Sequence, residues 1–300
     1  MAVSRTPRRE PVITVGLDGS PESLAAARWA AAEAERRDVG LRLLHAWPVL
    51  GPEPAEGPSD SDPSDWAKRM LDHARTEIRT RHPGLAVTGD LVEEEAPQAL
   101  LRAAAESEMT VLGSQGMDPV ERFFLGDVSM FVAARAERPV VLVRDATDGT
   151  GVPTTPTDEG GDVAVALKLH GPCDDLLGFA FATAAARGVP LRAVHGRGLP
   201  VNAYVPWGVD HDVAEETERA ARRDMDQVLR PWREAFPAVE VVDGIGLVSP
   251  AKALIGAART ANLLVVGRRR RRRALAPRLG PVAHAALHHA HCPVAVVPHD

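Results

Sequence analysis

The chain has 300 residues, of which 45% are hydrophobic and 25% are charged, and its formal net charge is −6. This length favours about two domains, and the acidic balance argues against general attraction to nucleic acid or anionic lipid. The 2 cysteines exclude a disulfide framework, and no apolar run approaches the roughly 18 residues that a membrane span needs. We therefore expect a soluble, cytoplasmic protein with no membrane association.

Short β-type runs alternate with helical patterns along the chain, which predicts a parallel sheet with helices on both faces. The first helix is expected to begin with Ser20 as its cap and Pro21 at its first position, because both residue types favour these places. A second helix carries Trp66, and the third and fourth are expected near Pro97 and after Gly126. The expected strands of this half lie near Val12–Leu17, Leu41–Ala46, Ala86–Val92, Met109–Leu112 and Val140–Val143.

The chain contains this pattern twice. The sequence VGLDGSPES in the first half aligns with VALKLHGPC in the second, and ERPVVLV aligns with HCPVAVV. We predict a tandem α/β protein in which each half is a doubly wound, five-stranded parallel-sheet domain. The domains are expected over residues 1–145 and 162–300, joined by a solvated linker over residues 146–161. The matched residues include Asp18 and Lys168, His45 and His195, and Gly113 and Gly267.

The carboxyl ends of the strands are the expected binding edge, because ligands of open α/β sheets bind there, where the strand order reverses. In the first half this edge is expected to hold Asp18, Gly19 and Ser20 after the first strand, and Gly113 after the fourth. Glycines let backbone N–H groups approach an anion, and a following helix adds partial positive charge. The sequence therefore predicts a phosphate site to which Ser129 offers a hydroxyl. Asp18 would accept hydrogen bonds from ribose or an exocyclic amine, or help to hold a divalent ion.

Other phosphate-binding and catalytic patterns are missing from the sequence. The first strand-to-helix turn has no G-x-G-x-x-G fingerprint, and no G-x-x-x-x-G-K-[ST] motif occurs anywhere. No nucleophile–base pair or water-positioning group is evident either. We predict no catalytic residues, and any ATP hydrolysis is expected to be slow and incidental.

The segments VGLDGS, VLGSQG, GDVS and RPVVLV resemble the universal stress protein family, as does LGPVAHAALHHAHCPVAVV in the second half. The resemblance runs from about Pro11 to Pro298 as two copies. It implies the five-stranded, adenine-nucleotide-hydrolase-like fold. Some members of this family bind ATP through G-x2-G-x9-G-[S/T], and others lack the motif and bind no nucleotide.

The resemblance implies ATP as the ligand of the first half, with Mg²⁺ as an optional companion ion. Paired domains in such proteins meet along their last strands, which implies an internal pseudo-dimer with Val140–Val143 against Val294–Val297. The implied site residues are the strand-one acid Asp18 with Gly19 and Ser20, the adenine-reading Ala46 and Trp47, the motif glycines Gly113, Gly116 and Gly126, and Asp127, Val128 and Ser129 after them.

The chain departs from the motif at Asp127, which stands where the family has Ser or Thr. A carboxylate about 4 Å from a phosphate oxygen costs a few kcal/mol at a surface-like dielectric. Asp127 would therefore have to turn away, coordinate Mg²⁺, pair with Arg122 or cap the helix.

The second half departs further, at three of the corresponding positions. Lys168 replaces the acid, Arg270 replaces the second glycine and is expected to fill the nest, and Pro281 removes both a hydroxyl and an N–H donor. We expect that this half does not bind ATP in the family manner. It would act as a packing partner for the first half or hold another ligand.

Two further runs carry charge or metal-ligating groups. The six arginines Arg268–Arg273 fit a solvated, self-repelling loop or a polyanion site, although no aromatic residues are interleaved for nucleic-acid stacking. The sequence HHAHC over residues 288–292 lacks a second ligand pair, so we predict no metal site. Cys173 and Cys292 are expected to act as small buried hydrophobes.

These observations leave several functions open. The first is an ATP-binding regulatory or stress-response module that acts on an unidentified protein partner. The second is a nucleotide-free interaction scaffold built as an internal pseudo-dimer. Polyanion binding through Arg268–Arg273 and ATP hydrolysis or transfer are further alternatives, and the sequence leaves open whether whole chains form a homodimer.

Overall fold

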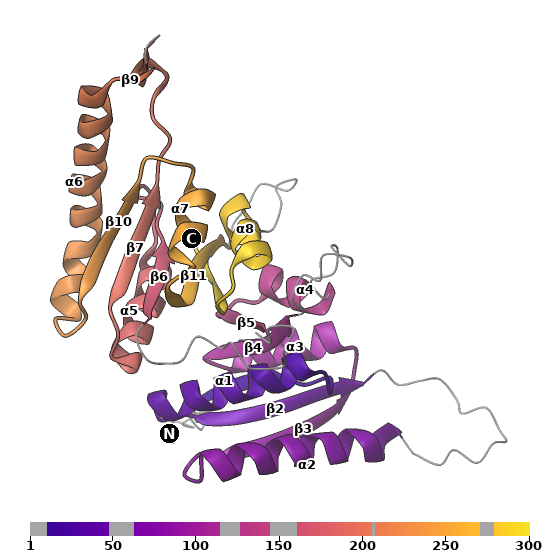
Figure 1. Ribbon diagram of the computed structural model, residues 1–300. Coiled ribbons are helices and arrows are strands. Elements are labelled where there is room, and N and C mark those ends of the chain that lie inside the picture. Colours follow the sequence, from indigo (N-terminus) through magenta and orange to yellow (C-terminus); the bar gives the residue numbers. More distant parts are fainter. Residues whose placement is uncertain (1–10, 48–62, 115–126, 145–160, 206–207, 271–278) are drawn as a thin grey trace, which may run out of the picture.

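The computed structural model describes residues 11–47, 63–114, 127–144, 161–205, 208–270 and 279–300 (Figure 1). The predicted linker over 146–161 therefore lies outside the described residues, apart from Gly161. Within the described part of the chain, none of the helices is long and apolar enough to cross a membrane.

Each half alternates strands and helices as predicted. The first half contains β1 (Val12–Gly16), α1 (Pro21–Arg37), β2 (Gly40–Trp47), α2 (Pro63–Arg81), β3 (Val87–Glu93), α3 (Ala96–Glu106), β4 (Met109–Ser114), α4 (Asp127–Arg135) and β5 (Val140–Arg144). The second half contains β6 (Asp162–Ala166), α5 (Asp174–Arg187), β7 (Leu191–Gly196), the 3-10 turn η1 (Val201–Ala203), β8 (Tyr204–Val205), β9 (Gly208–Val209), α6 (His211–Ala235), β10 (Val241–Gly246), α7 (Pro250–Ala257), β11 (Ala261–Arg269), α8 (Pro281–His289) and β12 (Val294–His299).

Local sequence signals fix the first helix. Ser20 caps α1 by accepting a hydrogen bond from the Ser23 backbone N–H at 3.1 Å, and Pro21 occupies the first turn, so both predictions are confirmed. The helix ends at Asp38, which adopts a left-handed conformation with φ 54° and closes the C-terminus through its own N–H. Small alanines cover the buried face of α1, which lets this helix lie close to the sheet.

Ten of the strands form one sheet in the order β10-β7-β6-β11-β12-β5-β4-β1-β2-β3, and the short strands β8 and β9 pair antiparallel apart from it. All pairs within the large sheet are parallel except β5 and β12, which pair antiparallel with Leu142 opposite Val294 and Val140 opposite Val296. This edge-to-edge joint confirms the predicted contact between the last strands (Figure 1). In each half the strand order reverses beside the first strand, between β1 and β4 and between β6 and β11.

Two apolar layers cover the faces of the sheet, and each layer continues across both halves. One layer contains buried residues of α1, α2, α5 and α6, and the other contains buried residues of α3, α4, α7 and α8. The strands contribute to both layers because alternate side chains point to opposite faces: Val111 belongs to the first layer and Leu112 to the second.

A buried ionic cluster joins the halves beside the sheet. Glu33 of α1 is fully buried and contacts Arg37 of the same helix at 2.8 Å and Arg187 of α5 at 2.9 Å. Arg37 also donates to the Thr183 hydroxyl of α5 at 2.8 Å, and the Arg187 guanidinium lies 5.1 Å from the centre of the Trp29 ring. Burial alone would raise the pKa of the Glu33 carboxyl, but attraction to Arg187 and Arg37 outweighs it and holds this pKa below its ordinary value.

Arginines also close helix ends across the joint. Arg144 at the end of β5 donates to the carbonyls of Ala290 and Leu287 at the C-terminus of α8. In the opposite direction, Arg268 of β11 donates to the carbonyl of Ala136, just after α4. Each half thus supplies a cation to the negative end of a helix in the other half.

Glu33→Gln should lower the free energy of unfolding by about 3 kcal/mol, because it leaves the buried guanidiniums of Arg37 and Arg187 without their carboxylate. Urea denaturation measures the change. The matched control is Glu218→Gln, which removes an exposed i,i+4 pair with Arg222 and should cost less than about 0.5 kcal/mol. Equal effects of the two variants would contradict the structural role of Glu33.

The contribution of Glu33 should also depend on pH. Because its pKa is lowered in the folded state, the stabilisation is fully present above the ordinary value of 4.5 and is lost as pH falls through the lowered folded value. The difference in unfolding free energy between the wild type and Glu33→Gln should therefore be constant from neutral pH down to about 5 and shrink below that. Urea denaturation at a series of pH values measures this. A free-energy difference that grows as the pH falls would contradict a lowered pKa of Glu33 in the folded state.

Candidate functional site

A small cavity at the carboxyl edge of the first half brings five of the predicted site residues together. Its volume is about 120 Å³ as lined by the described residues. It lies beside the point where the strand order reverses between β1 and β4, which is where the fold was expected to bind a ligand. The predicted residues that line it are Asp18, Ala46, Gly113, Val128 and Ser129.

The other predicted residues have different positions. Gly19, Ser20 and Trp47 are described but do not line the cavity. Gly116 and Gly126 lie outside the described residues, and Asp127 is described only as the first residue of α4. The hypotheses about the Asp127 side chain and about Arg122 therefore stay predictions.

Asp18 presents an ionised carboxylate at the edge of this cavity. Its Oδ1 accepts hydrogen bonds from the Ser20 backbone N–H at 2.9 Å and from the Ser20 hydroxyl at 2.6 Å. Burial raises the pKa of this carboxyl, but the hydrogen bonds with Ser20 and Ser23 more than compensate and leave the pKa below its ordinary value. Both Ser20 bonds end on Oδ1.

The two predicted serine hydroxyls already have partners in the protein. The Ser20 hydroxyl donates to Asp18 and accepts from the Ser23 N–H, so it serves the turn and the helix cap. The Ser129 hydroxyl donates to the Gly113 carbonyl at 3.0 Å, which links the start of α4 to the end of β4. A phosphate would have to replace this carbonyl as the acceptor of the Ser129 hydrogen bond. Ser129 is therefore a weaker hydrogen-bond donor to a phosphate than the sequence predicted.

Gly113 has a packing reason to be glycine. A Cβ at this position would lie 2.7 Å from the backbone carbon of Glu22 and 2.7 Å from the backbone nitrogen of Ser23. The first turn of α1 therefore packs directly on the end of β4, in a space that no side chain could share. This contact explains Gly113 without a phosphate, which the sequence alone could not reveal.

Aromatic residues lie beside the turn that carries Asp18. Trp66 of α2 lies over Gly19, whose φ of +85° requires glycine and whose added Cβ would come within 2.9 Å of the Trp66 ring. Trp66 also packs edge-on against His45, with 5.8 Å between ring centres. The indole N–H of Trp47, at the end of β2, is buried and has no partner among the described residues. A ligand at this end of β2 could supply the missing acceptor.

The two matched histidines perform the same structural task in both halves. His45 donates from Nδ1 to the Leu17 carbonyl at 2.7 Å, and His195 donates from Nδ1 to the Leu167 carbonyl at 3.0 Å. Each bond ties the end of the second strand to the residue after the first strand. The match between the two histidines in the repeat thus has a structural reason.

The sequence favoured a solvated loop for Arg268–Arg273, but the described arginines of this run do not all lie in one solvated surface. Arg268 and Arg269 belong to β11, and Arg268 is buried, where it closes the end of α4. Arg270 is exposed and forms an ion pair with Asp175 at the start of α5, instead of filling the second half's nest as expected. Arg271–Arg273 lie outside the described residues, so polyanion binding by them stays a prediction.

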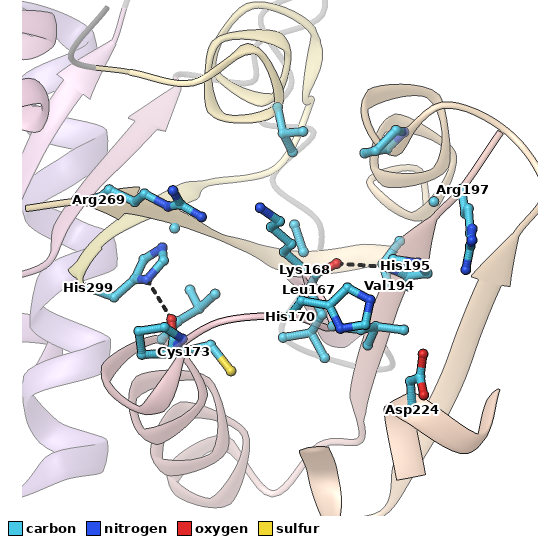
Figure 2. A pocket seen from close by; sticks show the side chains of 18 residues that line it. Leu167, Lys168, His170, Cys173, Val194, His195, Arg197, Asp224, Arg269 and His299 are labelled. Carbon is cyan, nitrogen blue, oxygen red and sulfur yellow. Dashed lines mark hydrogen bonds between the residues drawn. The ribbon is translucent and has the colours of Figure 1, made fainter. Parts of the chain in front are cut away.

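The second half contains a larger cavity, of about 530 Å³, at the equivalent edge (Figure 2). The sequence does not reveal the size of this cavity, because the two halves align here without a gap. In the structure the loop between the first strand and the first helix covers four residues, 17–20, in the first half and seven residues, 167–173, in the second. The longer loop displaces the helix start from the strand end, and the space opens.

The cysteines differ in environment. Cys292 is buried, and burial raises the pKa of its thiol to about 11, so it stays protonated at neutral pH and acts as the small hydrophobe predicted. Cys173 is half-buried at the start of α5 and lines the larger cavity, and burial also raises the pKa of its thiol. Among the described residues there is no group of three or more His, Cys, Asp or Glu arranged to hold a metal ion.

Gly113→Ala should destabilise the protein by about 1–3 kcal/mol, because the added methyl meets the backbone of α1 at 2.7 Å and neither element can move freely. Gly89→Ala in β3 is the matched control, since no atom lies within 4 Å of its added Cβ, and it should be neutral or slightly stabilising. Urea denaturation of both variants measures this. A Gly113→Ala variant as stable as the wild type would show that α1 does not pack this closely on Gly113.

Comparison with known proteins agrees with this fold. The model of the universal stress protein family matches residues 11–144 and 161–298. A universal stress protein of Mycobacterium tuberculosis is 30% identical over 300 residues, covering 97% of this chain and 98% of its own, and one of Mycolicibacterium smegmatis is 30% identical over 298 residues, covering 95% and 96%. A solved universal stress protein of Archaeoglobus fulgidus superposes with a TM-score of 0.66 at 17% identity, covering 96% of this chain and 98% of its own, which shows the shared fold. The chain belongs to the universal stress protein family, and it carries the family's domain twice.

Proposed function

We propose that the protein is a nucleotide-responsive regulatory protein whose first half binds ATP or another adenine nucleotide. The observation that supports this most is the convergence of Asp18, Ala46, Gly113, Val128 and Ser129 around one cavity at the reversal point of the sheet. These residues come from β2, β4, α4 and the turn after β1, and they are among those that the resemblance to the family implies.

The chemistry of this edge suits a nucleoside. The Asp18 carboxylate is ionised at neutral pH and can accept hydrogen bonds from the hydroxyls of a ribose. The main chain at Ala46, with the unpartnered Trp47 indole beside it, would contact the base. The phosphates would lie towards residues 113–129, where the start of α4 supplies partial positive charge.

The described cavity is too small for a whole nucleotide, at about 120 Å³. The base and ribose would therefore lie along its rim, and the phosphates would extend beyond it towards the motif residues Gly116 and Gly126. We propose no catalytic role for this site, because the two serines that line it, Ser23 and Ser129, both donate their hydroxyl protons to backbone carbonyls and not to a base.

Asp18→Asn should weaken ATP binding about tenfold, since an amide keeps the turn with Ser20 but loses the charge-assisted bonds to ribose. Equilibrium dialysis against ATP measures the affinity, with no more than about one nucleotide per chain expected. Asp72→Asn, which removes an exposed acid of α2, is the matched control and should leave the affinity unchanged.

Gly116→Arg gives the first half the residue that the second half has at this position, and it should abolish ATP binding. ATP binding that survives this change would show that the nucleotide lies elsewhere. If the wild type binds no ATP at millimolar concentration, the internal pseudo-dimer formed by β5 and β12 supports the alternative function of an interaction scaffold.

A further inference from the structure

The larger cavity lies at the carboxyl ends of β6, β7 and β11 and has a volume within the range of pockets that hold small molecules (Figure 2). It is not the site of the proposed function, which lies in the other half. Its walls are mainly apolar, and an apolar wall of this kind favours a ligand with a hydrophobic body. The apolar side chains that line it include Leu167, Leu169, Leu176, Val194 and Val282.

The neighbours of Gly267, which matches Gly113, explain why the second half has the larger cavity. Gly113 in the first half has the backbone of α1 directly against it, whereas a Cβ at Gly267 would meet the side chains of His299 at 2.4 Å and Leu176 at 3.3 Å. The start of α5 is therefore withdrawn from the end of β11, and side chains have replaced main chain beside the glycine. The Nδ1 of His299 lies within hydrogen-bond distance of two carbonyls, that of Asp300 at 2.9 Å and that of Pro172 at 3.2 Å.

The charge of the cavity is opposite to that of the first site. Lys168 stands at the position of Asp18, and Arg269 extends from the end of β11 towards Lys168 (Figure 2). Arg197 and Asp224 both lie at the other end of the pocket, so the single acid there is balanced by a cation. Among the residues that the structure describes, neither Lys168 nor Arg269 forms an ion pair with a carboxylate.

Three helices also begin at this cavity. Cys173 precedes α5, Pro250 begins α7 and Val282 lies in the first turn of α8, and all three line the pocket. The caps of α5 and α8 make no side-chain hydrogen bond to their helices. The partial positive charges at the starts of α7 and α8, which have no acid in their first turns, add to the field of Lys168 and Arg269, whereas Asp174 and Asp175 offset that of α5.

We propose that this cavity binds a small organic anion, whose phosphate or carboxylate group lies between Lys168 and Arg269 and whose apolar body lies on the leucine and valine wall. A lysine and an arginine are hydrogen-bond donors only, so they match an anionic group and cannot accept from ribose hydroxyls as Asp18 can. The two halves thus recognise different chemical classes through the same edge of the same fold.

Naphthyl phosphate and naphthoate are suitable probes, because each joins an aromatic body to one of the two anionic groups. Isothermal titration of the full-length protein should show binding of at least one of them. Naphthol, which lacks the charge, and inorganic phosphate, which lacks the body, should each bind at least tenfold more weakly. The stronger of the two anions then identifies the head group, and added salt should weaken its binding.

Lys168→Met and Arg269→Met keep apolar stems but remove the charges, and each should weaken binding of the anionic probe about tenfold. Arg259→Met is the matched control: it removes an exposed arginine of the same half at the opposite edge of the sheet and should leave the affinity unchanged. Circular dichroism and urea denaturation verify that all three variants are folded.

Three results would overturn the proposal. They are the absence of probe binding to the wild type at millimolar concentration, equal binding of naphthol, and unchanged affinity in both the Lys168 and Arg269 variants. ATP that displaces the probe from Gly116→Arg protein would also overturn it, by assigning the cavity to nucleotide. The two sites lie in different halves, so each can be tested without the other. Asp18→Asn should lose ATP affinity and keep probe affinity, which shows that a failure of the ATP proposal and a failure of the anion proposal are distinguishable.

Discussion

The antiparallel pairing of β5 with β12 is the contact on which the remaining architecture depends. Each half by itself would leave its last strand as an open edge, with unpaired N–H and C=O groups that invite other chains to pair with it. Joining these edges removes both at once and makes the two apolar layers continuous across the molecule. The buried Glu33 cluster then ties α1 of one half to α5 of the other, because its carboxylate is stable inside the protein only while guanidiniums surround it.

Much of this architecture could be predicted from the sequence. Nearly continuous apolar runs located the strands of the first half to within about two residues. The joint between Val140–Val143 and Val294–Val297 followed from the resemblance to the universal stress protein family. The cap at Ser20 followed from local chemistry. The Glu33 cluster could not be found this way, because an acid on a helix pattern reads as exposed unless its partner helix is known. Arg268 was expected in a solvated loop for the same reason. Nothing in a run of six arginines distinguishes the one that is buried and donates to the Ala136 carbonyl of the other half.

The candidate site was predicted in part, and the gaps have physical causes. The positions of Asp18, Ala46 and Gly113 follow from strand ends, which sequence patterns locate well. The roles of Ser20 and Ser129 do not, because a hydroxyl is available to a ligand only if no nearer group takes its proton. The open cavity of the second half was missed because motif positions report chemistry at single residues, whereas cavity size depends on loop length and on how closely a helix approaches a strand.

The helices that begin at the two cavities also end at the joint between the halves. Helix α1 runs from Ser20, beside the first site, to the buried Glu33 and Arg37, and α5 runs from Cys173, beside the second cavity, to Thr183 and Arg187. The Glu33 carboxylate therefore joins the two helices whose starts border the two cavities, because it pairs with Arg37 of α1 and Arg187 of α5. A pair of separate domains on a linker would lack this link, which is costly to break because it leaves a buried charge without a partner.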